Sequence, residues 1–175
     1  MRKAFIALVA TTALLASAWA AARPSELSDV IAAPKPYGTA TLTWLFLTAY
    51  EASLWTDART WSMDSTFALV IVYRMSFTRE ELVERTVEEM ARLSPPDAAA
   101  RERLSRALRK VFPDVKAGDR ITALHIPGRP VAFFHNGAPT SQIADPDFAD
   151  PFFGIWLSPQ TSEPSVRNGL LRSRS

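Results

Sequence analysis

The sequence contains no cysteine and only two histidines among its 175 residues. Without cysteine, the chain can form no disulfide bond, thiolate nucleophile, iron–sulfur cluster or covalent haem linkage. It also lacks the motifs of several enzyme classes, namely a glycine-rich phosphate loop, a G-x-S-x-G turn and an H-E-x-x-H zinc motif. The core alone must therefore hold the fold, and we expect no cofactor.

The two histidines, His125 and His135, each fall near the end of an expected hairpin strand, so they could lie close in space. Asp119 or Asp145 could join them, but a zinc site usually needs three or four ligands. Packing at the surface or within the hairpin is the simpler interpretation, and we expect no metal site.

The N-terminus predicts export. Residues 1–22 have the three parts of a secretory signal peptide, which are a basic start, an apolar run over 4–19 and small residues before Arg23. The apolar run is shorter than the roughly 20 residues that a permanent membrane span needs. We therefore expect cleavage between Ala20 and Arg23 and a periplasmic protein with no remaining span.

Cleavage would also remove the excess of positive charge. The chain has 20 Lys and Arg against 18 Asp and Glu, and Arg2 and Lys3 would leave with the signal peptide. The remaining charges would balance. Nucleic-acid binding usually needs a strong basic field, so we expect no nucleic-acid partner.

Two apolar stretches predict the first strands. Residues 39–55 are rich in Thr, Trp, Phe, Leu and Tyr, and the length of the stretch predicts a bulge near 50–52. Residues 67–75 are apolar on both faces as far as Arg74, which indicates a central strand that is covered on both sides.

Two helices are expected next. Thr78 and Glu81 form a capping box, and an apolar stripe continues from there to Leu93. A second helix is expected to end at Val111. The acidic residues of the first helix are expected on its solvated face, and these are Glu80, Glu81, Glu84, Glu88 and Glu89.

The remaining sequence predicts strands and then helices again. The expected features are strands over 120–126 and 130–135, a turn at 136–137, helices capped at the Asp-Pro steps 145–146 and 150–151, and a last helix over 164–171. Blocks of strands and helices in this order indicate an α+β domain with an antiparallel sheet. We place the domain at 38–175, after an extension over 23–37 that could lie along its surface.

Four residues are candidates for ligand binding: Arg74, Arg85, Trp44 and Tyr50. Arg74 ends an apolar strand, so a ligand carboxylate could balance its charge through a bidentate contact. A structural ion pair, or a strand end that reaches water, is the simpler interpretation of Arg74. The tryptophans, Trp44 among them, could line an apolar pocket or simply pack in the core.

Several stretches, taken in order, resemble the bacterial chalcone isomerase-like proteins. They are residues 44–54, 67–74, 112–119, 133–137, 145–159 and 170–171. The resemblance implies an open-faced β-sandwich, in which a layer of helices covers a curved antiparallel sheet with a cleft between them. Plant enzymes of the family cyclise chalcones to flavanones, and related plant proteins bind fatty acids in the same cleft.

The resemblance does not extend to the catalytic residues. It places Leu82, Arg85 and Glu89 where plant isomerases have Tyr, Lys and Asn, and it places Leu45 where they have an active-site Thr. No basic residue between Gly38 and Trp44 matches their ligand-binding Arg. We therefore expect no chalcone isomerase activity.

The expected function is non-catalytic binding of a small apolar or amphipathic ligand, such as a fatty acid or an aromatic carboxylate. Two alternatives remain open. One is an isomerase or lyase that uses other residues, and the other is an envelope protein that binds a protein partner.

Overall fold

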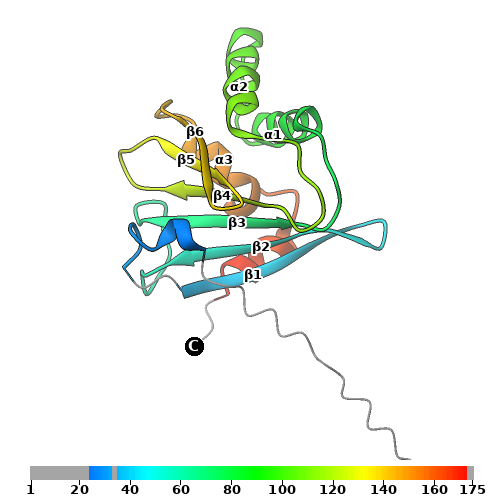
Figure 1. The fold of residues 1–175 in the computed structure, drawn as a ribbon. Coiled ribbons are helices and arrows are strands. Elements are labelled where there is room, and N and C mark those ends of the chain that lie inside the picture. The colour runs from blue at the N-terminus through cyan, green and yellow to red at the C-terminus, as the bar shows by residue number, and fades with distance from the viewer. Residues whose placement is uncertain (1–23, 33–34, 173–175) are drawn as a thin grey trace, which may run out of the picture.

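The computed structural model of the chain describes residues 24–32 and 35–172. In this part of the chain, six antiparallel strands form one sheet in the order β1-β2-β3-β4-β5-β6 (Figure 1). The elements are η1 (Ser25–Leu27), β1 (Lys35–Trp44), β2 (Leu47–Thr56), β3 (Phe67–Tyr73), α1 (Arg79–Leu93), α2 (Ala98–Val111), β4 (Arg120–His125), β5 (Val131–His135), β6 (Ala138–Ile143), α3 (Ala149–Leu157) and α4 (Pro164–Leu170). Each strand pairs with its neighbour in the sequence, as in a meander. The α+β class and the open-faced sandwich are confirmed.

The two faces of the sheet are covered differently. Helices α3 and α4 lie behind the sheet in Figure 1, and η1 lies in front of it. Successive side chains of a strand point to opposite faces, so alternate residues of β3 enter two separate cores. Leu69 and Ile71 belong to the large core under the helices, whereas Ala68 and Val70 belong to a small core under η1.

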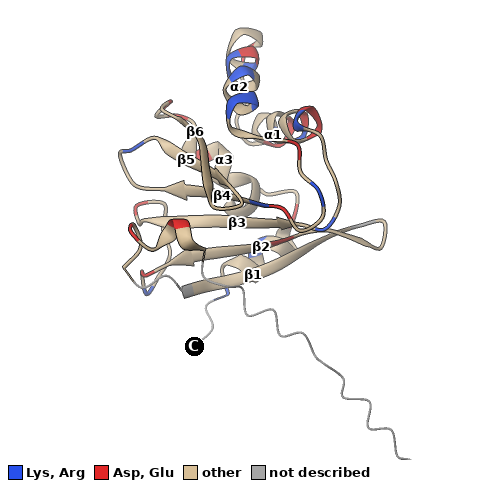
Figure 2. Cartoon of the chain, in the orientation of Figure 1, with Lys and Arg blue, Asp and Glu red and all other residues tan. Residues whose placement is uncertain are grey.

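The expected long strand over 39–55 is in fact a hairpin, so that prediction is wrong. β1 and β2 are joined at Leu45 and Phe46, which have positive φ angles of 46° and 67°. The pairing shifts between Leu42 and Thr43 and leaves Ala49 of β2 without a partner, so a bulge lies directly beside Tyr50, at the edge of the expected region 50–52. A second irregularity lies between Pro36 and Gly38. Tight hairpin turns of this kind usually contain Asn or Gly, and two bulky apolar residues give no sign of one. Figure 2 shows that this hairpin carries no charge toward its tip.

Other boundaries agree with the sequence. Thr78 and Glu81 form the expected capping box, α2 ends at Val111, and Asn136 with Gly137 forms a turn with positive φ at both residues. Strand β6 was not expected. The prediction that Asp145 and Asp150 cap helices is wrong. Helix α3 begins at Ala149, and its N-cap residue, Phe148, makes no side-chain hydrogen bond to the helix.

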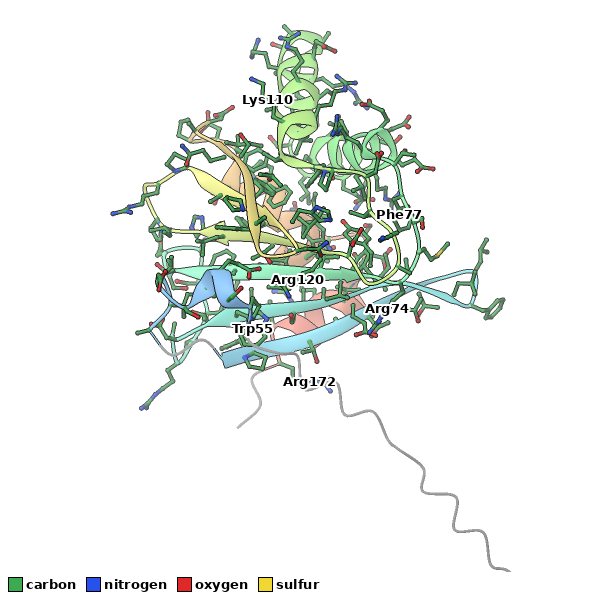
Figure 3. The ribbon with its side chains drawn as sticks, viewed as in Figure 1. Trp55, Arg74, Phe77, Lys110, Arg120 and Arg172 are labelled. Atoms are coloured by element: carbon green, nitrogen blue, oxygen red, sulfur yellow. The ribbon has the colours of Figure 1, made fainter. Side chains whose placement is uncertain are left out.

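The N-terminal segment packs on the face of the sheet away from the helices. Leu27 and Ile31 are fully buried there, against a cluster that includes Trp55. The carboxylate of Glu26, whose side chain is 1% exposed, accepts hydrogen bonds from Arg120 Nη2 at 3.1 Å and from Thr122 Oγ1 at 2.6 Å. Figure 3 shows Trp55 and Arg120 on this side of the sheet. The described part of the extension is therefore an integral layer, while residues 1–22 lie outside the described residues.

Glycines allow the last helix to approach the first strand closely. A Cβ atom at Gly38 would collide with the backbone oxygen of Leu170, and one at Gly169 would lie 2.7 Å from the backbone oxygen of Thr39. Neither position can hold a larger residue without moving α4 away from β1. Across the residues that are described, no helix combines the length and apolar character needed to cross a membrane.

Candidate ligand-binding cavity

A cavity of about 490 Å³ lies between the sheet and the helices that cover it. Its volume is within the range of about 300–1,000 Å³ that is typical of small-molecule sites. The buried apolar part of its wall includes Leu69, Ile71, Ile121, Ala123, Phe152 and Ile155.

The strand pattern explains why these walls face the cavity. Leu69 pairs with Ala123, and Ile71 pairs with Ile121, so four apolar side chains of β3 and β4 point toward the helices together. Ala123 and Ala49 each contribute only a methyl group to the lining. Larger side chains at these two positions would fill part of the space.

One side of helix α1 lines the cavity and supplies charged groups to it. Leu82, Arg85 and Glu89 all line the cavity, since positions three and four residues apart share a helix face. These are the three positions that the resemblance matched to plant catalytic residues. Leu45, matched to an active-site Thr, lies instead at the exposed hairpin turn, where 71% of it is accessible.

Glu89 is a buried carboxylate whose charge is balanced within the protein. Its side chain is 7% exposed and forms ion pairs with Arg85 at 2.8 Å and Arg92 at 3.1 Å, and Ser162 donates a hydrogen bond to it at 2.9 Å. The expectation that Glu89 lies on the solvated face is therefore wrong. The sequence shows the i,i+3 and i,i+4 arginines, but Ser162 is 73 residues away along the chain.

Exposed lining residues mark the cavity mouth, which we define as Thr43, Glu81 and Arg85. The side chain of Arg85 is 64% exposed, so its guanidinium can turn toward a ligand or toward water. Glu81 is held by the capping box, in which it accepts hydrogen bonds from the backbone N–H and the hydroxyl of Thr78. These hydrogen bonds keep the pKa of the Glu81 carboxyl below its usual value.

Tyr50, Tyr73 and Trp156 contact one another in the wall of the cavity. Trp156 Nε1 donates a hydrogen bond to the Tyr50 hydroxyl at 2.9 Å, and the rings of Tyr50 and Tyr73 meet edge to face at 6.3 Å. Burial raises the pKa of Tyr50 to about 12, although the hydrogen bond from Trp156 acts in the opposite direction. Burial and the neighbouring Tyr50 also raise the pKa of Tyr73. Both phenols therefore stay protonated near neutral pH, and Tyr50 can still donate a hydrogen bond.

The structure brings two of the four ligand candidates to the cavity. Tyr50 and Arg85 line it, and Arg74 lies outside the described lining. Arg74 forms an ion pair with Glu51, with Nη2 and Nε at 2.9 and 3.0 Å from the same carboxylate oxygen. Figure 3 shows Arg74 at the end of the sheet near the base of the β1–β2 hairpin. Trp44 ends β1, but its side chain lies outside the described part of the structure.

The two histidines do not lie close together. Each histidine is the last residue of its strand, and because β4 and β5 are antiparallel, their last residues lie at opposite ends of the pair. His135 is opposite Ile121, four residues before His125 in β4. The His125 ring packs on Phe67 and Phe153, and its Nε2 is bonded to the backbone oxygen of Met63 at 2.8 Å. His135 lies 3.7 Å from Asp119. The expectation that they could come together is wrong.

Comparison with known proteins agrees with this architecture. A family model described as chalcone isomerase-like matches residues 37–172. No curated protein is similar enough to match the chain. Among solved structures, a fatty-acid binding protein of Arabidopsis thaliana has a similar fold, with a TM-score of 0.61 and 8% identity over 79% of this chain and 87% of that chain. Identity this low supports a shared fold and carries no ligand over by itself.

Proposed function

Because this chain belongs to the chalcone isomerase-like family, we propose that the cavity it encloses serves to hold a small amphipathic ligand and that the protein is a non-enzymatic carrier. The observation that carries the proposal is the cavity of about 490 Å³ between the sheet and helices. Its floor is apolar, and its charged groups come from α1 and the segment before α4, so the two ends of an amphipathic ligand would find different surroundings.

A carboxylate head group would find hydrogen-bond donors in the polar part of the lining, which also holds the carboxylates of Glu81, Glu89 and Glu163. The Arg85 guanidinium and the Tyr50 hydroxyl can both donate hydrogen bonds, and an arginine binds a carboxylate in a bidentate manner. If Arg85 turns to a ligand, Arg92 and Ser162 still hold Glu89. The Arabidopsis thaliana protein of similar fold is a fatty-acid binding protein, which supports a fatty acid over an aromatic carboxylate.

The same groups support holding a ligand over proton abstraction. A general base must accept a proton near the working pH. The pKa of Tyr50 is about 12 and that of Tyr73 is also raised, so neither phenol is ionised at neutral pH. Glu89 is already paired with two arginines. For Tyr50, Tyr73 and Glu89, these contacts favour holding a ligand over proton abstraction.

The test is binding of hexadecanoate to the purified protein by isothermal titration calorimetry, with Arg85→Gln and Arg92→Gln as a matched pair. Both arginines pair with Glu89, but only Arg85 lines the cavity. We expect Arg85→Gln to weaken binding about tenfold, the value of one charged hydrogen bond, and Arg92→Gln to change it little. Ala123→Phe should abolish binding by filling the cavity.

Two results would contradict the proposal. One is the absence of binding for both hexadecanoate and cinnamate, and the other is unchanged binding by a folded Ala123→Phe variant. Thermal unfolding of each variant shows whether it is folded. Turnover of a chalcone above background, lost in Tyr50→Phe, would favour the isomerase alternative.

We also propose export to the periplasm, on the strength of residues 1–22. The apolar run, its basic start and the small residues before Arg23 support a cleaved signal peptide. Mass spectrometry of the protein from its native cells should give a chain that begins between Ala21 and Arg23. An intact Met1 in the cytoplasmic fraction would contradict export.

A further inference from the structure

The β1–β2 hairpin ends in three exposed apolar side chains, which we call the hairpin tip. Leu45 is 71% exposed, Phe46 is 99% exposed and Leu47 is 58% exposed. The hairpin projects beyond the ends of the neighbouring strands (Figure 1). Large apolar side chains that are this accessible contribute nothing to the core, so the fold does not explain them.

The backbone of the tip is also unfavourable for these residues. Leu45 and Phe46 both have positive φ, a conformation that is sterically unfavourable for residues other than glycine. The turn between β5 and β6 has the same geometry but uses Asn136 and Gly137, which tolerate it. One sheet thus contains an ordinary turn of this kind and one that places two bulky apolar residues in water.

The approach to the tip is free of charge. The sequence from Pro36 to Tyr50 contains no charged residue. Figure 2 shows the outer part of the hairpin without acidic or basic side chains, while charges gather on α1, α2 and the loops. An uncharged projection of this kind can enter an apolar phase without desolvating an ion.

The tip lies close to the cavity mouth. Leu42, Thr43, Ala49 and Tyr50 of the same hairpin line the cavity, and each is within four residues of the tip. An apolar ligand that entered here from water would first have to leave a membrane or another carrier. If the tip contacted a membrane, the ligand would travel only the length of the hairpin from the membrane to the cavity.

From these observations we propose that the hairpin tip inserts into the acyl region of a phospholipid bilayer and brings the cavity mouth to the membrane surface. A protein partner fits less well, because a stable interface buries about 800 Å² on each side and three side chains cannot supply that area. The neighbouring cations Arg74 and Arg85 are paired with Glu51 and Glu89. Insertion therefore depends on apolar burial and does not require anionic lipid.

The test uses the absence of cysteine from the chain. A single cysteine introduced by Leu45→Cys carries an environment-sensitive nitrobenzoxadiazole label, and Arg129→Cys carries the same label in the loop between β4 and β5. This loop lies at the opposite end of the sheet and is exposed. Vesicles of dioleoylphosphatidylcholine are added to each protein in its mature form, which lacks residues 1–22, without any fatty acid. The expected result is a blue shift of the label at position 45 and no shift at position 129.

A second variant measures the contribution of the tip. Adding Phe46→Asp to the labelled Leu45→Cys protein should weaken vesicle partitioning about tenfold or more, the value of burying one aromatic side chain. The tip is exposed and Asp tolerates positive φ, so this change should not lower the temperature of thermal unfolding. Replacing part of the lipid with phosphatidylglycerol should change the response little.

Four outcomes would overturn the inference. They are equal shifts at positions 45 and 129, no shift at either, a shift that requires phosphatidylglycerol, and a shift that appears without vesicles as the protein concentration rises. The last outcome would identify a second copy of the chain as the occupant. The biological purpose of membrane insertion, delivery of a ligand to the cavity, rests on the proposed function. The experiment on insertion contains no ligand, however, so it can fail while hexadecanoate binding succeeds.

Discussion

The two faces of the sheet are built from the same strands and are used in opposite ways. Under the helices, alternate residues of β2, β3 and β4 enclose a cavity of about 490 Å³. Under η1, the intervening residues of the same strands pack directly against Leu27 and Ile31, which are 0% exposed. A strand with apolar residues on both faces therefore says nothing about which face is filled.

The difference comes from the size and shape of what covers each face. A short segment lies flat on the sheet, and its buried Glu26 pairs with Arg120 and Thr122 of β4. Helices are held apart from the sheet by their own side chains, and the alanines at positions 49 and 123 leave space between them. We expect the η1 face to contribute stability and the helix face to contribute binding.

Truncating one leucine on each face gives the largest expected contrast. Leu27→Ala should lower the free energy of unfolding by about 3 kcal/mol, because the methyl groups it removes are fully packed. Leu82→Ala should cost about 1 kcal/mol, because this half-buried side chain already borders empty space. Urea denaturation monitored by tryptophan fluorescence measures both, and equal losses would show that the cavity is collapsed in solution.

A smaller effect is expected from the ion pair that holds η1. Glu26→Gln should destabilise the protein by about 2 kcal/mol, since Arg120 loses its carboxylate partner in a largely buried setting. Glu80→Gln is the control, because its partner Arg109 is on the surface and such pairs contribute about 0.5 kcal/mol or less. If the two losses in urea denaturation are alike, η1 is not anchored by Glu26.

The smallest effect at neutral pH concerns the phenols of the helix face. Tyr50→Phe should cost about 1 kcal/mol there, because Trp156 loses its acceptor. The raised pKa of Tyr50, about 12, means that stability is fully present below pH 10 and falls as the pH rises from 10 toward 12, where only the unfolded phenol is ionised. The variant should therefore lose less stability over this range. Parallel curves for the two proteins in urea denaturation from pH 8 to 12 would show that Tyr50 is not buried.

Local signals in the sequence were sufficient for most of the fold. The capping box of Thr78 and Glu81, the apolar strand expected over 67–75 and the Asn136-Gly137 turn each depend on residues close together in the chain. All three are confirmed, with the strand ending at Tyr73. The hairpin turn at Leu45 and Phe46 could not be predicted, because its residues are those that strands prefer. Strand β6 was missed because five of its six residues are exposed and give no apolar pattern.

The candidate site was only partly predictable, for a different reason. Arg85 and Tyr50 were expected to contact a ligand and do line the cavity, although no observation yet tests binding. The partners that define their setting come from distant parts of the chain. Trp156 is 106 residues from Tyr50, and Ser162 is 73 residues from Glu89. A single sequence carries no signal for contacts of this separation.

The close approach of Gly38 and Gly169 joins the first strand of the sheet to the last helix. During synthesis β1 is made first, but the helix that covers it is made more than 120 residues later. The cavity therefore cannot close while the chain is still being made, because one of its sides is completed only by the segment that leads into α4. Such long-range closure slows folding. It would keep the chain loosely organised until its final turn of helix has been added.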